Sequence, residues 1–185
     1  MSPYFKKLSL MLDVASVNKE VDLLRGHGAY TAWQKYGIAY KRRVDFNAAT
    51  NASYHLDERD KLQIVQQLPK GLLEVEVPDV WLLHAKAESY EGRVMLPPHV
   101  DGVRQCSINV YFKTNGEKTA YYEYRNGGNI DEVASFVAQP GDVYLLNSDK
   151  PHSVEVNGEP RQSVSISFIT TPYEVVERFF LEADA

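Results

Sequence analysis

The sequence holds very little cysteine: among its 185 residues, Cys106 alone carries a thiol. A single thiol excludes an intrachain disulfide and a zinc site built from several thiolates. The scarcity of cysteine fits the reducing environment of the cytoplasm, which we take as the expected location. Cys106 itself is expected to be a small core residue, because free cysteine is commonly buried.

Long apolar runs and an excess of positive charge are also missing. No run of about 18 apolar residues occurs, so we expect no membrane span. The apolar stretch Leu8–Leu12 is short, is followed by Asp13 and lacks a small-residue cleavage pattern, which argues against a signal peptide. A net charge of -5 argues against a broad nucleic-acid-binding surface, which would normally be basic.

The composition that remains is that of an ordinary globular protein, with 44% hydrophobic and 24% charged residues. The length fits one domain that can bury a real core. We therefore expect a single domain over residues 1–185. It divides into a helical or mixed N-terminal part (1–71), a β core (72–170) and a C-terminal helix (171–185).

Helices are expected at both ends of the chain. Ser16–Arg25 and Leu56–Gln67 are predicted as short helices, the second ended by Pro69 and Gly71. Thr171-Pro172-Tyr173-Glu174 has the capping-box pattern and begins the last helix. The apolar stripe of that helix is expected to pack on the sheet; it consists of Val175, Val176, Phe179 and Phe180.

Between the helices, short β-rich segments alternate with turn residues, which favours a sandwich or jelly roll. The Asn157-Gly158 turn predicts that the last two strands pair as a hairpin. The expected strands are Asp79–Glu88, His99–Lys113, Thr119–Tyr124, Ser135–Ala138, Val143–Asn147, His152–Val156 and Ser163–Thr170.

One segment carries the pattern of a metal site. In His99-Val100-Asp101, an imidazole and a carboxylate two residues apart project from the same face of a strand. His152, at the start of another strand, supplies a third candidate ligand. Two histidines and one carboxylate leave open positions on a metal and suit non-haem Fe(II). Taken singly, His-x-Asp occurs often by chance, and a histidine after Pro151 is also compatible with a turn.

A second polar pair follows on the next strand. Arg161 and Ser163 share one face of a segment that is otherwise apolar. A guanidinium directed into a barrel interior needs an anionic partner. That partner is either an acidic side chain in a structural salt bridge or a dicarboxylate ligand, bound by two hydrogen bonds from the arginine and one from the serine.

Order and spacing together resemble a known superfamily, the 2-oxoglutarate/Fe(II)-dependent oxygenases. The resemblance extends over residues 79–170 and includes the Pro140-Gly141-Asp142 turn. The positions that carry it are His99-x-Asp101, His152 and Arg161-x-Ser163.

The resemblance implies a mainly β protein with a double-stranded β-helix, a form of jelly roll, flanked by the terminal helices. It implies Fe(II), 2-oxoglutarate as co-substrate and O2. It further implies that oxidative decarboxylation of 2-oxoglutarate to succinate is coupled to oxidation, usually hydroxylation, of a substrate. The ligands would be His99, Asp101 and His152 for iron, with Arg161 and Ser163 binding the far carboxylate.

Other polar residues near this pattern are assigned less directly. Asn109 and Tyr111 share a face, and Asn109 is expected to contact the near carboxylate because a buried amide needs a partner. Arg104 either contacts the substrate or is a solvated surface residue. Tyr121, Tyr122 and Tyr124 are expected to be packing residues, unless one of them lines the pocket.

Two other functions stay open at this point. One is a cupin-type metalloenzyme that does not use 2-oxoglutarate; such proteins often carry His-x-His, so the His-x-Asp pattern favours the oxygenase. The other is a ligand-binding jelly roll without catalysis. The small chain favours a small-molecule substrate, with a peptide side chain as a further option, and the sequence does not predict an oligomeric state.

Overall fold

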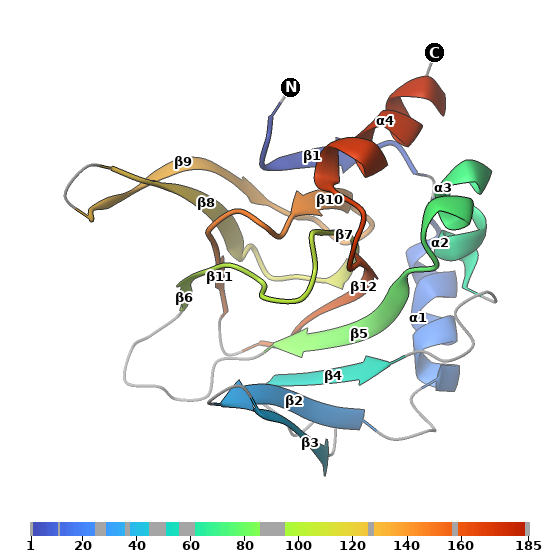
Figure 1. Cartoon of the computed structure of the whole chain (residues 1–185). Coiled ribbons are helices and arrows are strands. Elements are labelled where there is room, and N and C mark those ends of the chain that lie inside the picture. Colours follow the sequence, from blue (N-terminus) through green and yellow to red (C-terminus); the bar gives the residue numbers. More distant parts are fainter. Residues whose placement is uncertain are drawn as a thin grey trace.

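A computed structural model describes residues 2–10, 12–24, 29–35, 38–44, 51–55, 62–85, 95–125, 128–156 and 159–183. They form a large and a small antiparallel sheet (Figure 1). In spatial order the large sheet contains β1 (Phe5–Leu8), β10 (Val143–Asn147), β7 (Cys106–Lys113), β12 (Arg161–Phe168), β5 (Asp79–Ala85), β4 (Asn51–His55), β2 (Ala29–Lys35) and β3 (Ile38–Val44). The small sheet contains β6 (Met95–His99), β11 (His152–Glu155), β8 (Lys118–Tyr124) and β9 (Ile130–Val137).

From β5 onward the chain passes back and forth between the two sheets, with β8 and β9 forming a hairpin within the small one. β5, β7, β10 and β12 belong to the large sheet, whereas β6, β8, β9 and β11 belong to the small one. This alternation produces the expected double-stranded β-helix, and the mainly antiparallel β jelly roll is confirmed.

The predicted hairpin between the last two strands is wrong. β11 pairs with β6 and β8, while β12 pairs with β5 and β7 in the opposite sheet. Burial explains the difference, because β12 is covered on both faces and occupies a central position that a terminal hairpin would not provide. The turn residues Asn157 and Gly158 lie outside the described residues.

The main hydrophobic core lies between the large sheet and the helices, on the outer side of the jelly roll. Along β12, Val164, Ile166 and Phe168 point to this core and Ser163, Ser165 and Ser167 point the other way. The covering helices are α1 (Val14–Leu24), α2 (Gln63–Gln66), α3 (Lys70–Val75) and α4 (Tyr173–Ala183) (Figure 1). Because the helices bury the outer face, the inner face of β12 can be polar.

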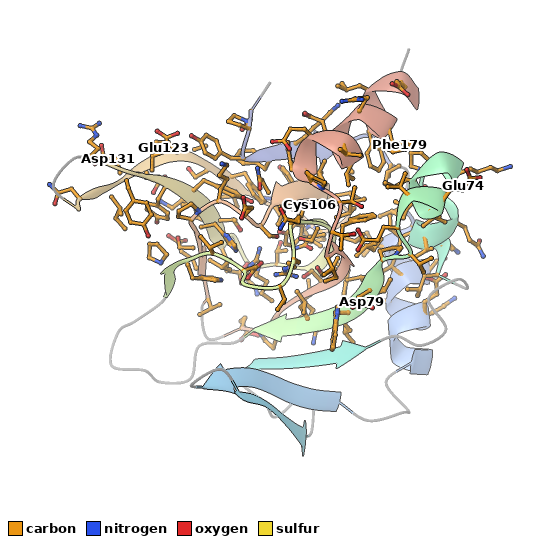
Figure 2. All side chains as sticks on the ribbon, in the orientation of Figure 1. Glu74, Asp79, Cys106, Glu123, Asp131 and Phe179 are labelled. Carbon is orange, nitrogen blue, oxygen red and sulfur yellow. The ribbon has the colours of Figure 1, made fainter. Side chains whose placement is uncertain are left out.

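The predicted helices are present in the structure, but some of their boundaries differ from the prediction. α1 begins at Val14, because Asp13 accepts hydrogen bonds from the Ala15 amide and the Ser16 hydroxyl. Gly71 does not end a helix but lies within α3. A Cβ at Gly71 would lie 3.0 Å from the ring of Phe179, so glycine allows α4 to approach α3 closely. Figure 2 shows Phe179 directed toward α3.

Several strand boundaries also differ from expectation. The predicted strand His99–Lys113 is broken into β6 and β7 by a loop over residues 100–105. That loop is held by backbone bonds from Asp101 N to Ser148 O and from Gln105 N to Phe168 O. β9 is longer than predicted, and β1 to β4 were not predicted. Residues 56–61 and 86–88 of predicted elements lie outside the described residues.

Two further sequence expectations can be compared with the structure. Cys106 is fully buried, as expected, and burial raises the pKa of its thiol far above the usual range. Within the described ranges, no helix is long and apolar enough to cross a membrane.

A carboxylate clamp joins the end of α3 to the turn between β12 and α4. Glu76 accepts hydrogen bonds from the backbone amides of Ile169, Thr170 and Thr171, at 2.7, 3.2 and 2.8 Å, and from both threonine hydroxyls. Partial burial acts to raise the pKa of Glu76, but these hydrogen bonds outweigh it and hold the pKa below its usual value.

We expect Glu76→Ala to lower the free energy of unfolding at pH 7 by about 1–3 kcal/mol, because several charge-assisted hydrogen bonds are lost together. A lowered native pKa means that this contribution is present above the usual carboxyl pKa and is lost as the pH falls through the native value. The difference between variant and wild type should therefore shrink below about pH 4. Urea unfolding at pH 7 and pH 3 measures it, with exposed Glu74→Ala (Figure 2) as control. Equal stability of the two variants at pH 7 would contradict the clamp.

Candidate metal centre and polar interior

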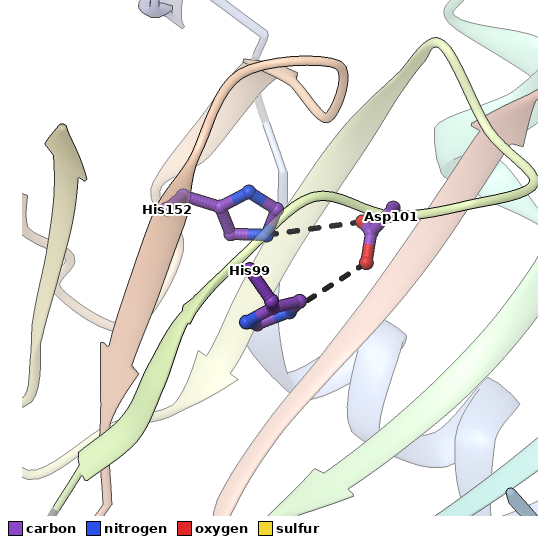
Figure 3. Close-up of side chains that lie close together, drawn as sticks. All are labelled: His99, Asp101 and His152. Atoms are coloured by element: carbon purple, nitrogen blue, oxygen red, sulfur yellow. Dashed lines mark ion pairs between the residues drawn. The ribbon is translucent and has the colours of Figure 1, made fainter. Parts of the chain in front are cut away.

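Three side chains predicted as metal ligands converge at one end of the small sheet. His99 ends β6, His152 begins β11, and the two residues are directly paired across these antiparallel strands. Asp101 follows His99 in the loop, so it reaches the same place from outside the strand rather than from within it. One ligand atom from each residue lies within 4.8 Å of the other two (Figure 3).

The distances within this cluster suit ligands of a shared cation better than direct hydrogen bonds. His99 Nε2 lies 3.7 Å from Asp101 Oδ1, and His152 Nε2 lies 3.8 Å from Asp101 Oδ2. Both separations exceed hydrogen-bonding length. They are shorter than about twice a typical metal–ligand bond of roughly 2.1 Å, so an ion between Asp101 and either imidazole can contact both groups.

The imidazole of His152 is fixed in the tautomer that a metal needs. Its Nδ1–H donates to the carbonyl of Lys150 at 2.9 Å, which leaves the Nε2 lone pair directed toward Asp101. His152 is only 7% exposed, and this burial lowers its pKa despite the opposing charge of Asp101. A neutral imidazole is the form that binds metals.

The carboxylate of Asp101 is held ionised. Burial acts to raise its pKa, but the positive charge of Arg104, the nearby imidazoles and a hydrogen bond from Arg104 Nε together lower it. That bond, to Oδ2, is 2.6 Å long. Arg104 is therefore not the solvated surface residue that the sequence allowed; it partners a candidate metal ligand.

The second predicted pair, Arg161 and Ser163, lies on the inner face of β12. Arg161 donates to the Thr119 hydroxyl at 3.1 Å, and its guanidinium carbon lies 4.9 Å from the centre of the Tyr111 ring. No carboxylate forms a salt bridge with Arg161 in the parts of the chain that the structure describes. The structural salt bridge considered from the sequence is thus not seen, while Ser163 is buried beside Tyr111.

The interior between the sheets contains buried polar atoms that lack hydrogen-bond partners. Among the described residues they include Asn109 Oδ1, Ser107 Oγ, and the hydroxyls of Tyr111 and Tyr121. Ser107, Asn109 and Tyr111 alternate along the inner face of β7, opposite the serines of β12. Buried polar groups are nearly always paired, so these atoms are expected to bind ordered water or a polar ligand in the interior.

Some residues of this interior were not expected from the sequence, and the roles of others were left open. Tyr121 is a packing residue, as expected, in a second buried cluster with Tyr111 and Phe136, and its ring also lies beside His152, with ring centres 5.7 Å apart. Tyr122 forms a hydrogen bond with Ser153, whereas Tyr124 is 72% exposed, so the expectation that it packs is wrong. Thr119 was not singled out. The spacing of two in Thr119-x-Tyr121 on β8 was the available signal, since it places both on one face.

A pocket of about 360 Å³ opens beside Asp101 and Arg104. Its remaining lining comes from β5, from the loop after Asp101 and from the end of β12: Asp79, Trp81, Gly102, Val103, Ser167 and Ile169. Val103 is 69% exposed at this pocket, so the candidate metal ligand borders a cavity with an apolar rim.

No protein-family model and no curated protein sequence matches the chain, so the comparison depends on solved structures. SnoN, a non-haem α-ketoglutarate-dependent epimerase of nogalamycin biosynthesis, aligns with TM-score 0.54 and 15% identity, covering 88% of this chain and 77% of SnoN. A prolyl-4-hydroxylase of Pseudomonas putida aligns with TM-score 0.53 and 14% identity, covering 91% and 93%.

AviO1 from Streptomyces viridochromogenes Tue57 aligns with TM-score 0.50 and 17% identity, covering 89% of this chain and 88% of AviO1. A further structure of SnoN contains Fe3+, α-ketoglutarate and nogalamycin RO. At such identities the likeness concerns the fold. The chain therefore has the jelly-roll fold of 2-oxoglutarate/Fe(II) oxygenases, and a His-Asp-His cluster lies within it.

Proposed function

We propose that this chain is a single-domain Fe(II)- and 2-oxoglutarate-dependent oxygenase that hydroxylates a small-molecule or peptide substrate. In this proposal His99, Asp101 and His152 hold Fe(II), Arg161 and Ser163 hold the far carboxylate of 2-oxoglutarate, and Asn109 contacts the near one. The observation that carries the proposal is the combination, in one interior, of the ligand cluster and a guanidinium without an acidic partner in the described chain.

The residues present fit Fe(II). Two imidazoles and one carboxylate form a borderline donor set with net charge of minus one, and such a set with open positions is typical of non-haem Fe(II) oxygenases. A cluster of several thiolates, which would favour zinc, is excluded by the single cysteine. The hydrogen bond from His152 Nδ1 to Lys150 O further supports metal ligation, because it is the usual outer partner of a ligating histidine.

The interior also fits 2-oxoglutarate. This dianion carries a carboxylate at one end and a 2-oxo acid group at the other, so it needs a cation at one end and a metal at the other. Arg161 supplies the cation, with Ser163 two residues away on the same face. The unpartnered atoms of Tyr111 and Tyr121 lie in the same interior and can donate hydrogen bonds to carboxylate oxygens.

The protein's own contribution to the reaction is to bind, orient and exclude water. Fe(II), when bound, supplies activation of O2, so that 2-oxoglutarate, O2 and a substrate C–H bond give succinate, CO2 and an alcohol. Arg161 fixes the far end of the co-substrate, the buried Tyr121 ring covers His152, and the apolar rim at Val103 keeps a bound substrate partly shielded from water.

Arg161 also separates this proposal from a cupin-type enzyme without 2-oxoglutarate. Such an enzyme needs the metal cluster but no cation deeper in the interior. Burying part of a guanidinium beside an aromatic ring is costly unless an anion accompanies it. We therefore favour the dicarboxylate-dependent enzyme over the cupin alternative and over a jelly roll without catalysis.

Turnover of 2-oxoglutarate provides the direct test. The full chain, freed of metal with a chelator, is supplied with Fe(II), ascorbate, O2 and 2-oxoglutarate, and succinate is measured with and without panels of small molecules and peptides. We expect slow succinate formation without substrate and faster formation with the right class. SnoN, an epimerase, shows why succinate is a better readout than a hydroxylated product. Fe(II) binding without any succinate formation or 2-oxoglutarate binding would refute the co-substrate assignment.

A further inference from the structure

Arg104 links the candidate metal centre to the large sheet. It follows Asp101 by three residues, and its Nε donates to Asp101 Oδ2 at 2.6 Å. Both side chains are largely buried, with 22% and 17% of their surfaces exposed. The ion pair is thus not an ordinary surface salt bridge, which would contribute little.

The other side of the Arg104 guanidinium is bound to the inner face of β12. Its Nη1 donates to the hydroxyls of Ser165 and Ser167, at 3.2 and 3.4 Å, and these serines are almost completely buried. The guanidinium therefore spans from a central strand of the large sheet to a carboxylate that stands beside two histidines of the small sheet.

A loop carboxylate without such a partner would be free to rotate. Asp101 lies beyond the end of β6, and its amide donates to Ser148 O, the one backbone bond that it makes with the described residues. With Oδ2 engaged by Arg104, Oδ1 stays on the side of His99, 3.7 Å from Nε2.

We propose that Arg104 is a positioning residue of the metal centre: it holds the Asp101 carboxylate in one orientation and anchors it to β12, the strand that also carries Arg161. This inference rests on the proposed metal-binding function. It assigns Arg104 no contact with the reacting atoms.

Charge and position make opposite contributions to metal affinity. A guanidinium near a divalent cation repels it, so removal of the charge alone would tighten metal binding. Removal of a group that orients a ligand weakens binding, typically by about 10- to 100-fold. We expect position to dominate, because Asp101 is the single anionic ligand and the guanidinium is fixed by two serines.

Co(II) is a suitable probe because it gives a visible absorption band that reports coordination geometry. The full-length protein without metal is titrated with Co(II) under nitrogen, against a competing chelator. Arg104→Lys retains the positive charge but loses the planar guanidinium with its several N–H donors, and Arg104→Gln loses the charge. Ser165→Ala combined with Ser167→Ala removes the anchor while leaving both charged residues. Arg125→Gln, at an exposed ion pair with Asp131, is the control.

We expect both Arg104 variants to bind Co(II) about 10- to 100-fold more weakly and with an altered band, the serine pair several-fold more weakly, and the control unchanged. Thermal unfolding without metal shows whether each variant is folded at the titration temperature. If an Arg104 variant is not folded, the serine pair decides the matter by the same measurement. Affinity equal to or tighter than wild type in Arg104→Gln, or in the serine pair, would overturn the inference.

The outcomes separate this inference from the function on which it depends. If the wild-type chain does not bind Co(II), the proposed metal centre itself fails. If wild type binds Co(II) with 1:1 stoichiometry and the Arg104 and serine variants bind it equally well, the metal centre stands and only the positioning role of Arg104 is lost.

Discussion

Asp101→Ala is expected to abolish succinate formation and to weaken metal binding by more than about 100-fold. Loss of a residue that only hydrogen-bonds a metal ligand weakens binding by up to about 100-fold, and loss of the ligand itself should have a larger effect. Asp101 offers the only carboxylate in the cluster, so its removal leaves two neutral imidazoles. Neutral ligands hold Fe(II) less tightly, and they leave one more position open to water.

Asp101→Asn refines this experiment. The amide oxygen can still accept a hydrogen bond from Arg104, but the negative charge is gone. We expect metal binding nearly as weak as in Asp101→Ala, together with a smaller loss of stability in the metal-free protein, because Arg104 keeps a partner. Calorimetric titration with Fe(II) under nitrogen and succinate assays measure both variants. Asp131→Asn, in the remote β8–β9 hairpin, is the control. Retention of metal and full activity in Asp101→Ala would refute the ligand assignment.

Arg161→Lys is expected to raise the 2-oxoglutarate concentration needed for binding by about ten- to a hundredfold while leaving Fe(II) binding nearly unchanged. Lysine keeps the charge but loses the planar fork that bonds a carboxylate twice. Loss of one charge-assisted hydrogen bond, roughly 1.5–3 kcal/mol, accounts for that factor. Arg161→Met, which also removes the charge, should weaken binding further.

The measurement is a titration of 2-oxoglutarate into the Fe(II)-loaded protein under nitrogen, followed by the charge-transfer absorbance of the complex. Thr119→Val is the matched control, because it removes the hydroxyl that accepts from Arg161 without touching the guanidinium. We expect that control to change affinity only a few-fold. Identical curves for wild type, Arg161→Lys and Arg161→Met would make Arg161 a structural residue and remove the main support for 2-oxoglutarate.

The sequence predicted which polar side chains lie together better than it predicted the strand pairing. The pattern of residue types was enough to group His99, Asp101 and His152, which converge in the structure, while their role as metal ligands stays a prediction. The partners of β11 could not be predicted in this way, because the Asn157-Gly158 turn indicates a local hairpin. In this double-stranded β-helix β11 and β12 belong to opposite sheets, and β11 pairs with β6 and β8. Long-range burial, not the turn, decides where β12 lies.

Other features were missed for different physical reasons. β3 gave no strand signal, because Lys41-Arg42-Arg43 interrupts any alternation of polar and apolar residues. The role of Arg104 was left open between contact with the substrate and exposure to solvent, because its partners Ser165 and Ser167 are distant in sequence. Asn109 was expected to point inward, and its amide oxygen does lie in the interior without a hydrogen-bond partner. Its contact with 2-oxoglutarate stays a prediction.

The placement of the main hydrophobic core outside the sandwich has a consequence for how this protein can change. On β12, fold stability depends on Val164, Ile166 and Phe168, while the serines between them line the interior. Selection, natural or in the laboratory, can therefore vary specificity and stability at alternate positions of a single strand. A combinatorial library confined to Ser163, Ser165 and Ser167 should yield mostly folded proteins, whereas one confined to the outward positions of β12 should yield few.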